Sequence, residues 1–183
     1  MKLETPVRTE STARKTNIRY WILLTLFVVT TINHVDRATL SMAAPMMRKD
    51  LGIDPVAMGY VFGAFGWSYA ALQIPGGWFL DRFGSRLVYG TALFAWSLMT
   101  LLQGIAGFLV GSSAFITLLA LRFLLGVAEA PAFPGNSRIV TSWFPTHERG
   151  FSSAVFNSAQ YFALAAFTPL MGWILAGWGW QWV

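Results

Sequence analysis

The sequence contains no cysteine, and only 11% of its 183 residues are charged. The absence of cysteine excludes disulfide bonds, thiol catalysis and cysteine-based zinc sites. A soluble domain carries about 25% charged residues, so the low charge is atypical of one. The chain also lacks a glycine-rich phosphate loop and the metalloprotease and serine-hydrolase motifs. We therefore expect neither an enzyme nor a metal-binding protein.

What the sequence has instead is apolar residues, which make up 55% of the chain and give a mean hydropathy of +0.53. These values are typical of a protein that crosses the membrane several times, and we predict an all-α membrane protein. The predicted segments are a polar cytoplasmic tail over 1–19, spans over 20–42, 56–80, 87–108, 114–140 and 151–175, cytoplasmic loops over 81–86 and 141–150, and the approach to a sixth span over 176–183.

The positive charges are distributed unevenly between the two sides of these spans. Five Lys or Arg residues lie in the tail, and others lie in or beside the segments 81–86 and 141–150. The opposite side has only Arg48 and Lys49, which nearby aspartates offset. Because cytoplasmic loops carry an excess of Lys and Arg, the N-terminus is predicted to be cytoplasmic. The net charge of +5 follows this pattern and does not indicate nucleic-acid binding.

A row of glycines lies on one side of the second predicted span. Gly59, Gly63 and Gly66 are spaced so that they share a helix face. Small residues at such spacing let another helix approach closely. The row predicts a helix-packing face.

Two ionisable residues interrupt the longest apolar run, which contains Arg122 and Glu129. They are seven residues apart, so they share one helix face with Gly126 between them, about 10 Å apart along the axis. Pro131 and Pro134 are expected to disturb the helix just beyond this pair. A charge inside the membrane is costly unless it faces a protein interior or a water-filled cavity. The pair therefore indicates either a binding site or an ion pair that locks two helices together.

A second pair of charges, Asp36 and Arg37, lies late in the first predicted span. Consecutive residues differ by about 100° around a helix, and neither of these is expected to face lipid. The first and fourth spans correspond to each other in two three-span units, and buried charges in such spans indicate a midplane binding site. The alternative is that Asp36 and Arg37 only cap the end of the span near the outer surface.

The third motif joins the second and third spans and reads G-x3-D-R-x-G-x-R, with Gly77, Asp81, Arg82, Gly84 and Arg86. The acid can accept hydrogen bonds from the free N–H groups at a neighbouring helix N-terminus. The motif resembles the signature of the major facilitator superfamily, in which this segment is a conformational latch that does not contact substrate. The alternative is an ordinary positively charged cytoplasmic loop.

Three further stretches extend this resemblance: HVDRATLS at 34–41, the segment 121–150, and FNSAQYF at 156–162. Together they resemble the anion:cation symporter branch of the superfamily, most of all bacterial transporters of D-glucarate and galactarate, with galactonate carriers next. The resemblance covers 20–183. It implies the N-terminal six-helix bundle of the major facilitator fold, truncated at the start of helix 6, and a C-terminal half as the missing partner.

The resemblance also implies roles for particular residues. It implies proton coupling by Asp36 and Glu129, and substrate binding by Arg37, Tyr69, Arg122 and Gln160. Asn157 and Asn136 are further candidates, because their side-chain amides suit the hydroxyls of a substrate. The chemistry agrees, because planar guanidinium groups suit carboxylates and neutral groups suit the hydroxyls of a sugar acid. We expect Arg122 to be the main carboxylate anchor.

The leading functional hypothesis is a symporter for small organic anions in the bacterial inner membrane, which uses a proton gradient and no cofactor. Its substrate would be a sugar acid such as glucarate or galactarate, or another carboxylate such as galactonate. The alternatives are a non-transporting helical module, such as a sensor or assembly subunit, and a membrane enzyme that uses Glu129 as acid and base. We expect this chain alone not to transport, because alternating access requires two bundles.

Overall fold

The structure is a computed structural model that describes residues 17–182, all of whose regular elements are helices. The predicted tail over 1–19 lies almost entirely outside the described residues, as does residue 183. The helices are α1 (Ile18–Leu51), α2 (Pro55–Phe83), α3 (Ser85–Ile105), η1 (Ala106–Phe108), α4 (Ser112–Glu129), α5 (Ala132–Trp143), α6 (Thr146–Trp178) and η2 (Trp180–Trp182).

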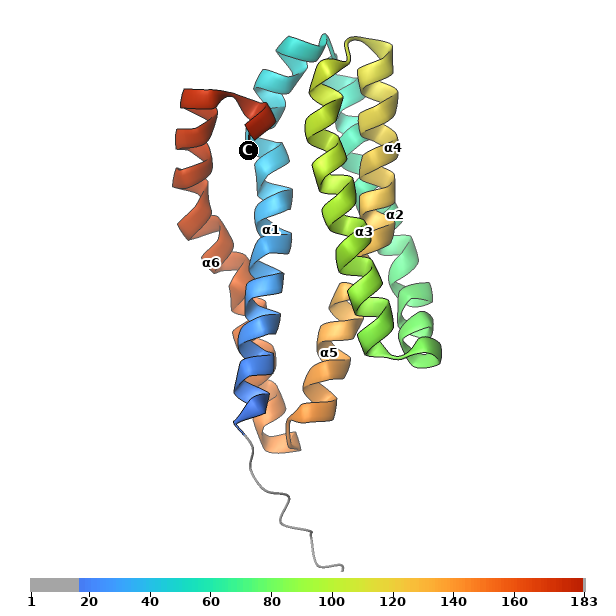
Figure 1. Cartoon of the computed structure of the whole chain (residues 1–183), viewed down its shortest axis with the longest axis vertical. Helices are drawn as coiled ribbons and strands as arrows, with labels where there is room; N and C mark the ends of the chain where they lie inside the picture. The colour runs from blue at the N-terminus through green and yellow to red at the C-terminus, as the bar shows by residue number, and fades with distance from the viewer. Residues whose placement is uncertain (1–16, 183) are drawn as a thin grey trace, which may run out of the picture.

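The helices form two groups that lie next to each other (Figure 1). Helix α1 packs along α6, while α4 packs against both α2 and α3. Helix α5 continues from α4 toward the other group and contacts helices of both. We call the end of the bundle where α1 begins the inner end, and the end where α1 finishes the outer end. Charged residues in the middle of α1 and α4 therefore meet between the two groups.

The surface of the bundle is apolar, as expected for a protein in lipid. Large side chains such as Trp67, Ile74 and Phe94 are 79%, 85% and 73% exposed. Four described segments are long and apolar enough to cross a membrane: Ile18–Leu51, Ser85–Gly104, Ser112–Trp143 and Thr146–Trp178. Helix α2 is not among the four, since its many Gly, Trp and Tyr residues lower its hydropathy. These features describe a multi-pass membrane protein.

The connections at the inner end are shorter than the sequence predicts. Only Gly84, with a φ of 82°, separates α2 from α3 inside the predicted loop 81–86. The predicted loop 141–150 is mostly helical, because α5 ends at Trp143 and α6 begins at Thr146. Polar residues continue these helices beyond the apolar segments, so the change in polarity does not mark the helix ends.

The predicted span 114–140 consists of two helices in the structure. Helix α4 ends at Glu129 and α5 begins at Ala132, on either side of Pro131. Proline has no N–H group to donate to the preceding turn and its ring crowds that turn, which favours a break there. The break gives α5 a direction of its own and leaves Glu129 as the last residue of α4.

Two apolar clusters hold the ends of the bundle. The inner cluster contains Leu23, Leu26, Val140, Phe144 and Phe156. The outer cluster is larger and joins the end of α1 to α2, α4 and the C-terminal turn. Between the clusters the structure buries polar and charged groups, and these form the candidate site.

Candidate functional site

A cavity of about 290 Å³ lies toward the inner end, lined by α1, α2, α3, α5 and α6. We call it the inner cavity. Four of the predicted substrate-binding residues line it, namely Arg37, Tyr69, Asn157 and Gln160. Further polar groups that sequence reasoning did not assign to the site also line it, including Asn33, Gln73 and Tyr89. The inner cavity thus combines the guanidinium group of Arg37 and the imidazole of His34 with several hydroxyl and amide groups.

The guanidinium of Arg37 forms an ion pair with Glu129. Its Nη2 and Nε both donate to Glu129 Oε2, at 2.6 and 3.1 Å. The Arg37 side chain is 29% exposed toward the cavity, whereas that of Glu129 is 1% exposed. The guanidinium also lies over the rings of Tyr69 and Phe65, with its carbon 4.6 and 4.9 Å from their centroids. Cation–π contacts of this kind hold the charge in place beside the cavity.

The approach of α4 to α2 depends on Gly126. A Cβ atom at this position would overlap the Ser68 hydroxyl and would lie 2.6 Å from the carbonyl oxygen of Phe65. Only glycine lets the helix backbones come this close. The contact lies next to Tyr69 and one turn before Glu129, so it fixes both groups around Arg37. By contrast, Gly59 and Gly66 of the predicted packing row have nothing within 4 Å of such a Cβ.

A chain of hydrogen bonds joins three helices on the inner side. The hydroxyl of Tyr89 donates to Asn136 Oδ1 at 2.7 Å, and Asn136 Nδ2 donates to Thr30 Oγ1 at 3.2 Å. Asn136 is 4% exposed. All three residues line the inner cavity, and the chain fixes one wall of it. No charge marks these residues in the sequence, which is why sequence reasoning did not bring Tyr89 and Thr30 into the site.

A second cavity, of about 260 Å³, lies toward the outer end. We call it the outer chamber. Asp36 and Arg122 line it, together with polar residues of α1, α3 and η2. Arg122 is only 4% exposed, and within residues 17–182 it forms no hydrogen bond or ion pair. Its charge acts on Asp36 and Glu129 at longer range.

The structure therefore divides the predicted site residues between two cavities. Arg37, with its partner Glu129 beneath it, belongs to the inner cavity, whereas Asp36 and Arg122 belong to the outer chamber. Arg122 and Glu129 both face the interior, as their spacing predicts. However, Arg122 does not line the cavity that contains Tyr69 and the amides. The expected grouping of both arginines around one pocket is absent from the described residues.

The predicted latch segment lies at the inner surface. Asp81 pairs with Arg138 of α5, a residue outside the predicted latch, and the two side chains are 78% and 37% exposed. Arg82 lies over Trp78, 5.5 Å from the ring centroid. The sequence predicts that Asp81 accepts hydrogen bonds from a helix N-terminus. In the structure it pairs with the guanidinium of Arg138 instead. Among the described residues, the ion pair joins the end of α2 to α5.

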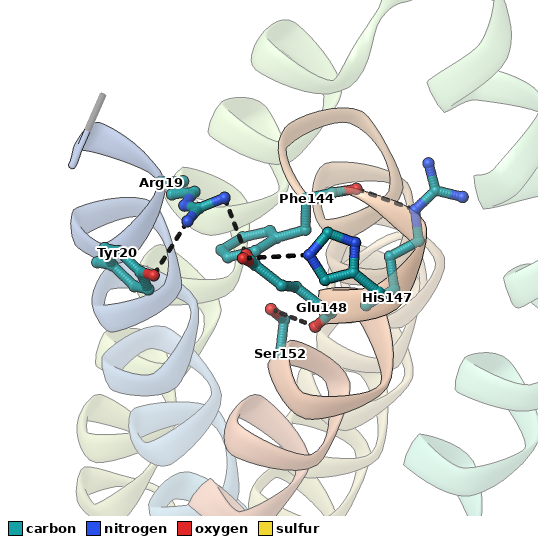
Figure 2. A network of polar contacts seen from close by, with 7 residues as sticks. Arg19, Tyr20, Phe144, His147, Glu148 and Ser152 are labelled. Atoms are coloured by element: carbon teal, nitrogen blue, oxygen red, sulfur yellow. Dashed lines mark hydrogen bonds and ion pairs between the residues drawn. The ribbon is translucent and has the colours of Figure 1, made fainter. Parts of the chain in front are cut away.

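A second surface network joins α1 to α6 at the same end (Figure 2). Arg19 donates to the hydroxyl of Tyr20 at 3.1 Å and pairs with Glu148 at 2.9 Å. His147 lies 3.7 Å from the other carboxylate oxygen of Glu148. The neighbouring Arg149 donates to the Phe144 carbonyl at 3.0 Å and so holds the turn between α5 and α6. The network holds the inner ends of α1 and α6 together.

Comparison with known proteins places this arrangement in a family. The chain is 57% identical over 168 residues to the probable galactarate/D-glucarate transporter GudP of Bacillus subtilis, which covers 92% of this chain and 37% of the relative. It is 60% identical over 159 residues to the transporter of the same name from Pseudomonas putida, covering 87% and 35%. Identity to the D-galactonate transporter of Escherichia coli O6:H1 is 45% over 181 residues, covering 99% and 40%. The chain thus spans two-fifths or less of the length of these curated relatives.

Solved structures show the same fold. A bacterial homologue of the human lysosomal transporter Spinster, in an inward-facing and occupied conformation, matches with a TM-score of 0.73 at 22% identity, over 91% of this chain and 39% of that one. The family model described as Major Facilitator Superfamily matches residues 26–183. This range includes every residue that lines the inner cavity and the outer chamber. The buried charges between two groups of membrane helices are therefore those of a transporter fold, and this chain belongs to the Major Facilitator Superfamily.

Proposed function

We propose that the inner cavity binds a sugar acid, such as galactarate or D-glucarate, and that the chain acts in the proton-coupled transport of this anion. The observation that carries the proposal is the position of Arg37, a permanently charged fork beside hydroxyl and amide groups in one cavity. A carboxylate group suits a guanidinium, and the substrate hydroxyls suit Tyr69, Asn157 and Gln160. The names of the relatives support this substrate class.

Coupling to protons follows from the partner that Arg37 already has. Its Nη2 and Nε donate to Glu129, so an arriving carboxylate competes with Glu129 for the same donors. Protonation of Glu129 removes the negative charge that holds Arg37 and so frees the guanidinium for substrate. Proton binding and anion binding then favour each other, which is the thermodynamic requirement for symport. Asp36 is proposed as the second proton-binding carboxyl.

The proposed location is the bacterial inner membrane, with the inner end of the bundle in the cytoplasm. The uneven distribution of Lys and Arg supports this orientation. In this orientation the inner cavity lies on the cytoplasmic side and the Asp81–Arg138 pair lies at the cytoplasmic surface. The motif around this pair, with Gly77, Gly84 and Arg86, is proposed to act as a conformational latch.

Binding is tested on the chain itself in lipid nanodiscs by thermal-shift measurement. Galactarate, D-glucarate and D-galactonate should raise the melting temperature, while glucose and amino acids should not. The stabilisation follows from binding to the folded state alone. A chain that responds to none of the acids, at any pH between 5 and 8, would support the alternative of a non-transporting helical module.

Transport is tested in liposomes with a chimaera in which this chain replaces the aligned part of the probable galactarate/D-glucarate transporter GudP of Escherichia coli, 57% identical over 171 residues. An inward proton gradient should drive accumulation of labelled glucarate, and neutral glucose should not compete. Liposomes that contain only this chain should not accumulate glucarate, because alternating access uses two bundles around a midplane site. Uptake by the chain alone would contradict this part of the proposal.

A further inference from the structure

His34 is a side chain of the inner cavity to which the proposed function gives no role. It lies on α1, three residues before Arg37, and both residues line the cavity. Three residues along a helix bring a side chain back to nearly the same face, about one turn away. Among the described residues that line the cavity, Arg37 and His34 are the two whose side chains can carry a positive charge. The imidazole therefore lies beside the same space as the proposed carboxylate anchor.

The hydrogen bond of His34 determines which of its ring nitrogens carries a proton. Its Nδ1 lies 2.9 Å from the backbone carbonyl oxygen of Thr30, one turn earlier on α1. A carbonyl oxygen only accepts hydrogen bonds, so Nδ1 is the donor and carries the proton. A neutral imidazole has one such proton, which leaves Nε2 with a lone pair and makes it an acceptor. A second proton on Nε2 would place two positive charges one turn apart on α1, where they repel each other.

The Nε2 atom of His34 is available to a molecule that enters the cavity. Within residues 17–182 it forms no hydrogen bond or ion pair, and it is not among the buried atoms that lack a partner. The side chain is only partly buried, so this nitrogen is accessible. Because His34 lines the inner cavity, a ligand in the cavity can reach this acceptor.

The other polar side chains of the cavity differ from His34 because they can donate hydrogen bonds. The guanidinium of Arg37 only donates, whereas hydroxyl groups and side-chain amides both donate and accept. The amide of Asn136 is already used by the protein, since it accepts from Tyr89 and donates to Thr30. Among the side chains that line the cavity, the neutral imidazole of His34 is therefore the one whose free polar atom only accepts.

We propose that His34 is a specificity-determining residue of the inner cavity, where its neutral Nε2 accepts a hydrogen bond from a hydroxyl group of the bound sugar acid. The oxygen of an ionised carboxylate only accepts hydrogen bonds, so it would meet the Nε2 lone pair with no proton between them. The substrate is therefore oriented with a carboxylate at Arg37 and a hydroxyl at His34. The inference rests on the proposed function and names the hydroxyl as the feature that distinguishes sugar acids from unhydroxylated dicarboxylates such as adipate.

Two substitutions of His34 separate the roles of its ring nitrogens. Asparagine is the shorter amide and reaches the position of Nδ1, so His34→Asn can still donate to the Thr30 carbonyl but has no group at the position of Nε2. Glutamine is one carbon longer, so His34→Gln brings its amide oxygen to the position of Nε2, where it accepts from a hydroxyl. Neither amide takes up a proton near neutral pH. The pair therefore separates acceptance at Nε2 from the bond to Thr30 and from a proton relay.

Affinity is measured by calorimetry on the chain in lipid nanodiscs, with galactarate and adipate as the ligands. His34→Asn should weaken galactarate binding about tenfold, because one substrate hydroxyl loses its acceptor. His34→Gln should bind galactarate within about threefold of the unaltered chain, since the acceptor is restored. Adipate binding should be unchanged in both variants. His147→Asn is the matched control, because the side chain of this histidine is 79% exposed at the inner surface, and it should change neither affinity.

Equal galactarate affinity in His34→Asn and the unaltered chain would overturn the inference. A loss in His34→Gln as large as that in His34→Asn would also overturn it, and so would an equal fall in the affinities for galactarate and adipate. Circular dichroism verifies that each variant is helical, and if His34→Asn does not fold, loss of galactarate binding by a folded His34→Gln is sufficient to overturn the inference. If the unaltered chain binds no sugar acid, the proposed function fails and this inference fails with it.

Discussion

The inner cavity and the outer chamber each contain one arginine and one nearby carboxyl group, but only the inner charges touch. Arg37 pairs with Glu129 at 2.6 Å, whereas Arg122 and Asp36 form no ion pair among the described residues. The Arg37 guanidinium of the inner pair also contacts the aromatic rings of Phe65 and Tyr69. The outer charges line a second cavity together with residues of α1, α3 and η2.

This difference indicates two separate electrostatic roles for charges that look equivalent in the sequence. A directly paired carboxylate controls whether its arginine is free to bind an anion. The inner cavity is thus suited to substrate binding, whereas Asp36 and Arg122 lie outside it. The following changes are ordered from the largest expected effect to the smallest.

The largest effect is expected from neutral replacements of the two carboxyl groups in the GudP chimaera. Glu129→Gln and Asp36→Asn should both abolish uptake driven by a pH gradient, because neither amide binds and releases a proton. At least one of the two should still bind or exchange glucarate, since the amides preserve the shape of the site. Glu148→Gln, a change in the surface network, serves as the control and should leave uptake intact. Unchanged pH-driven uptake in both carboxyl variants would remove them from the mechanism.

The contrast between a carboxyl group that forms an ion pair and one that does not should also appear in the free energy of unfolding. Glu129→Ala removes the ion-pair partner of Arg37, whose side chain is partly exposed to the inner cavity, and it is expected to cost about 1.5–3 kcal/mol. Asp36→Ala removes a carboxyl group that forms no ion pair among the described residues, and it is expected to cost about 1 kcal/mol. Unfolding of the chain in mixed micelles, followed by circular dichroism, measures both. Equal losses would show that the two regions do not differ in the way the geometry indicates.

The sequence identifies which residues must face the interior, and the structure agrees for all four charges in apolar runs. The cost of a charge in lipid is large enough that burial follows from composition alone. A disturbance of the helix just beyond Glu129 was predictable from Pro131 and Pro134, but a complete break was not, since Pro45, Pro75 and Pro169 lie inside continuous helices. Membership of the superfamily follows from motifs that are local in the chain.

The choice of partners could not be predicted in the same way. Arg37 meets Glu129 only because α4 approaches α2 closely at Gly126 and places the end of α4 beside α1. The predicted packing row at Gly59 and Gly66 contains more glycines but has open space beside it. Such contacts depend on how helices rotate and cross in three dimensions, which helical spacing within one segment does not determine. For the same reason Arg122 and Glu129 share a helix face and yet serve different cavities.

Lysine replacements distinguish the two arginines as substrate anchors. Arg37→Lys keeps the positive charge but loses the planar fork, and a charge-assisted hydrogen bond contributes about 1.5–3 kcal/mol. Affinity of the chain for glucarate should therefore fall about 10–100-fold, as measured by thermal shift or calorimetry. Arg122→Lys should change affinity less, because Arg122 does not line the inner cavity. If instead Arg122→Lys has the larger effect, Arg122 is the main anchor, as the sequence analysis predicts.

The last prediction concerns Gly126, where α4 approaches α2 closely. Gly126 lies between Arg122, which faces the outer chamber, and Glu129, which supports the inner cavity. Gly126→Ala would place a methyl group against the Ser68 hydroxyl and the Phe65 carbonyl, so α4 must move away from α2. Such overpacking costs about 1–3 kcal/mol. Gly66→Ala is the matched control, because nothing lies within 4 Å of its Cβ and alanine is the better helix former.

The Gly126→Ala variant also sharpens the comparison between the two regions. Moving α4 away from α2 carries Glu129 away from its position beside Tyr69 and Arg37. Glucarate affinity should therefore fall together with stability. Gly66→Ala should alter neither measurement. If Gly126→Ala lowered stability but left glucarate affinity unchanged, the close approach of α4 to α2 would not support the inner cavity, and that role of Gly126 would have to be abandoned.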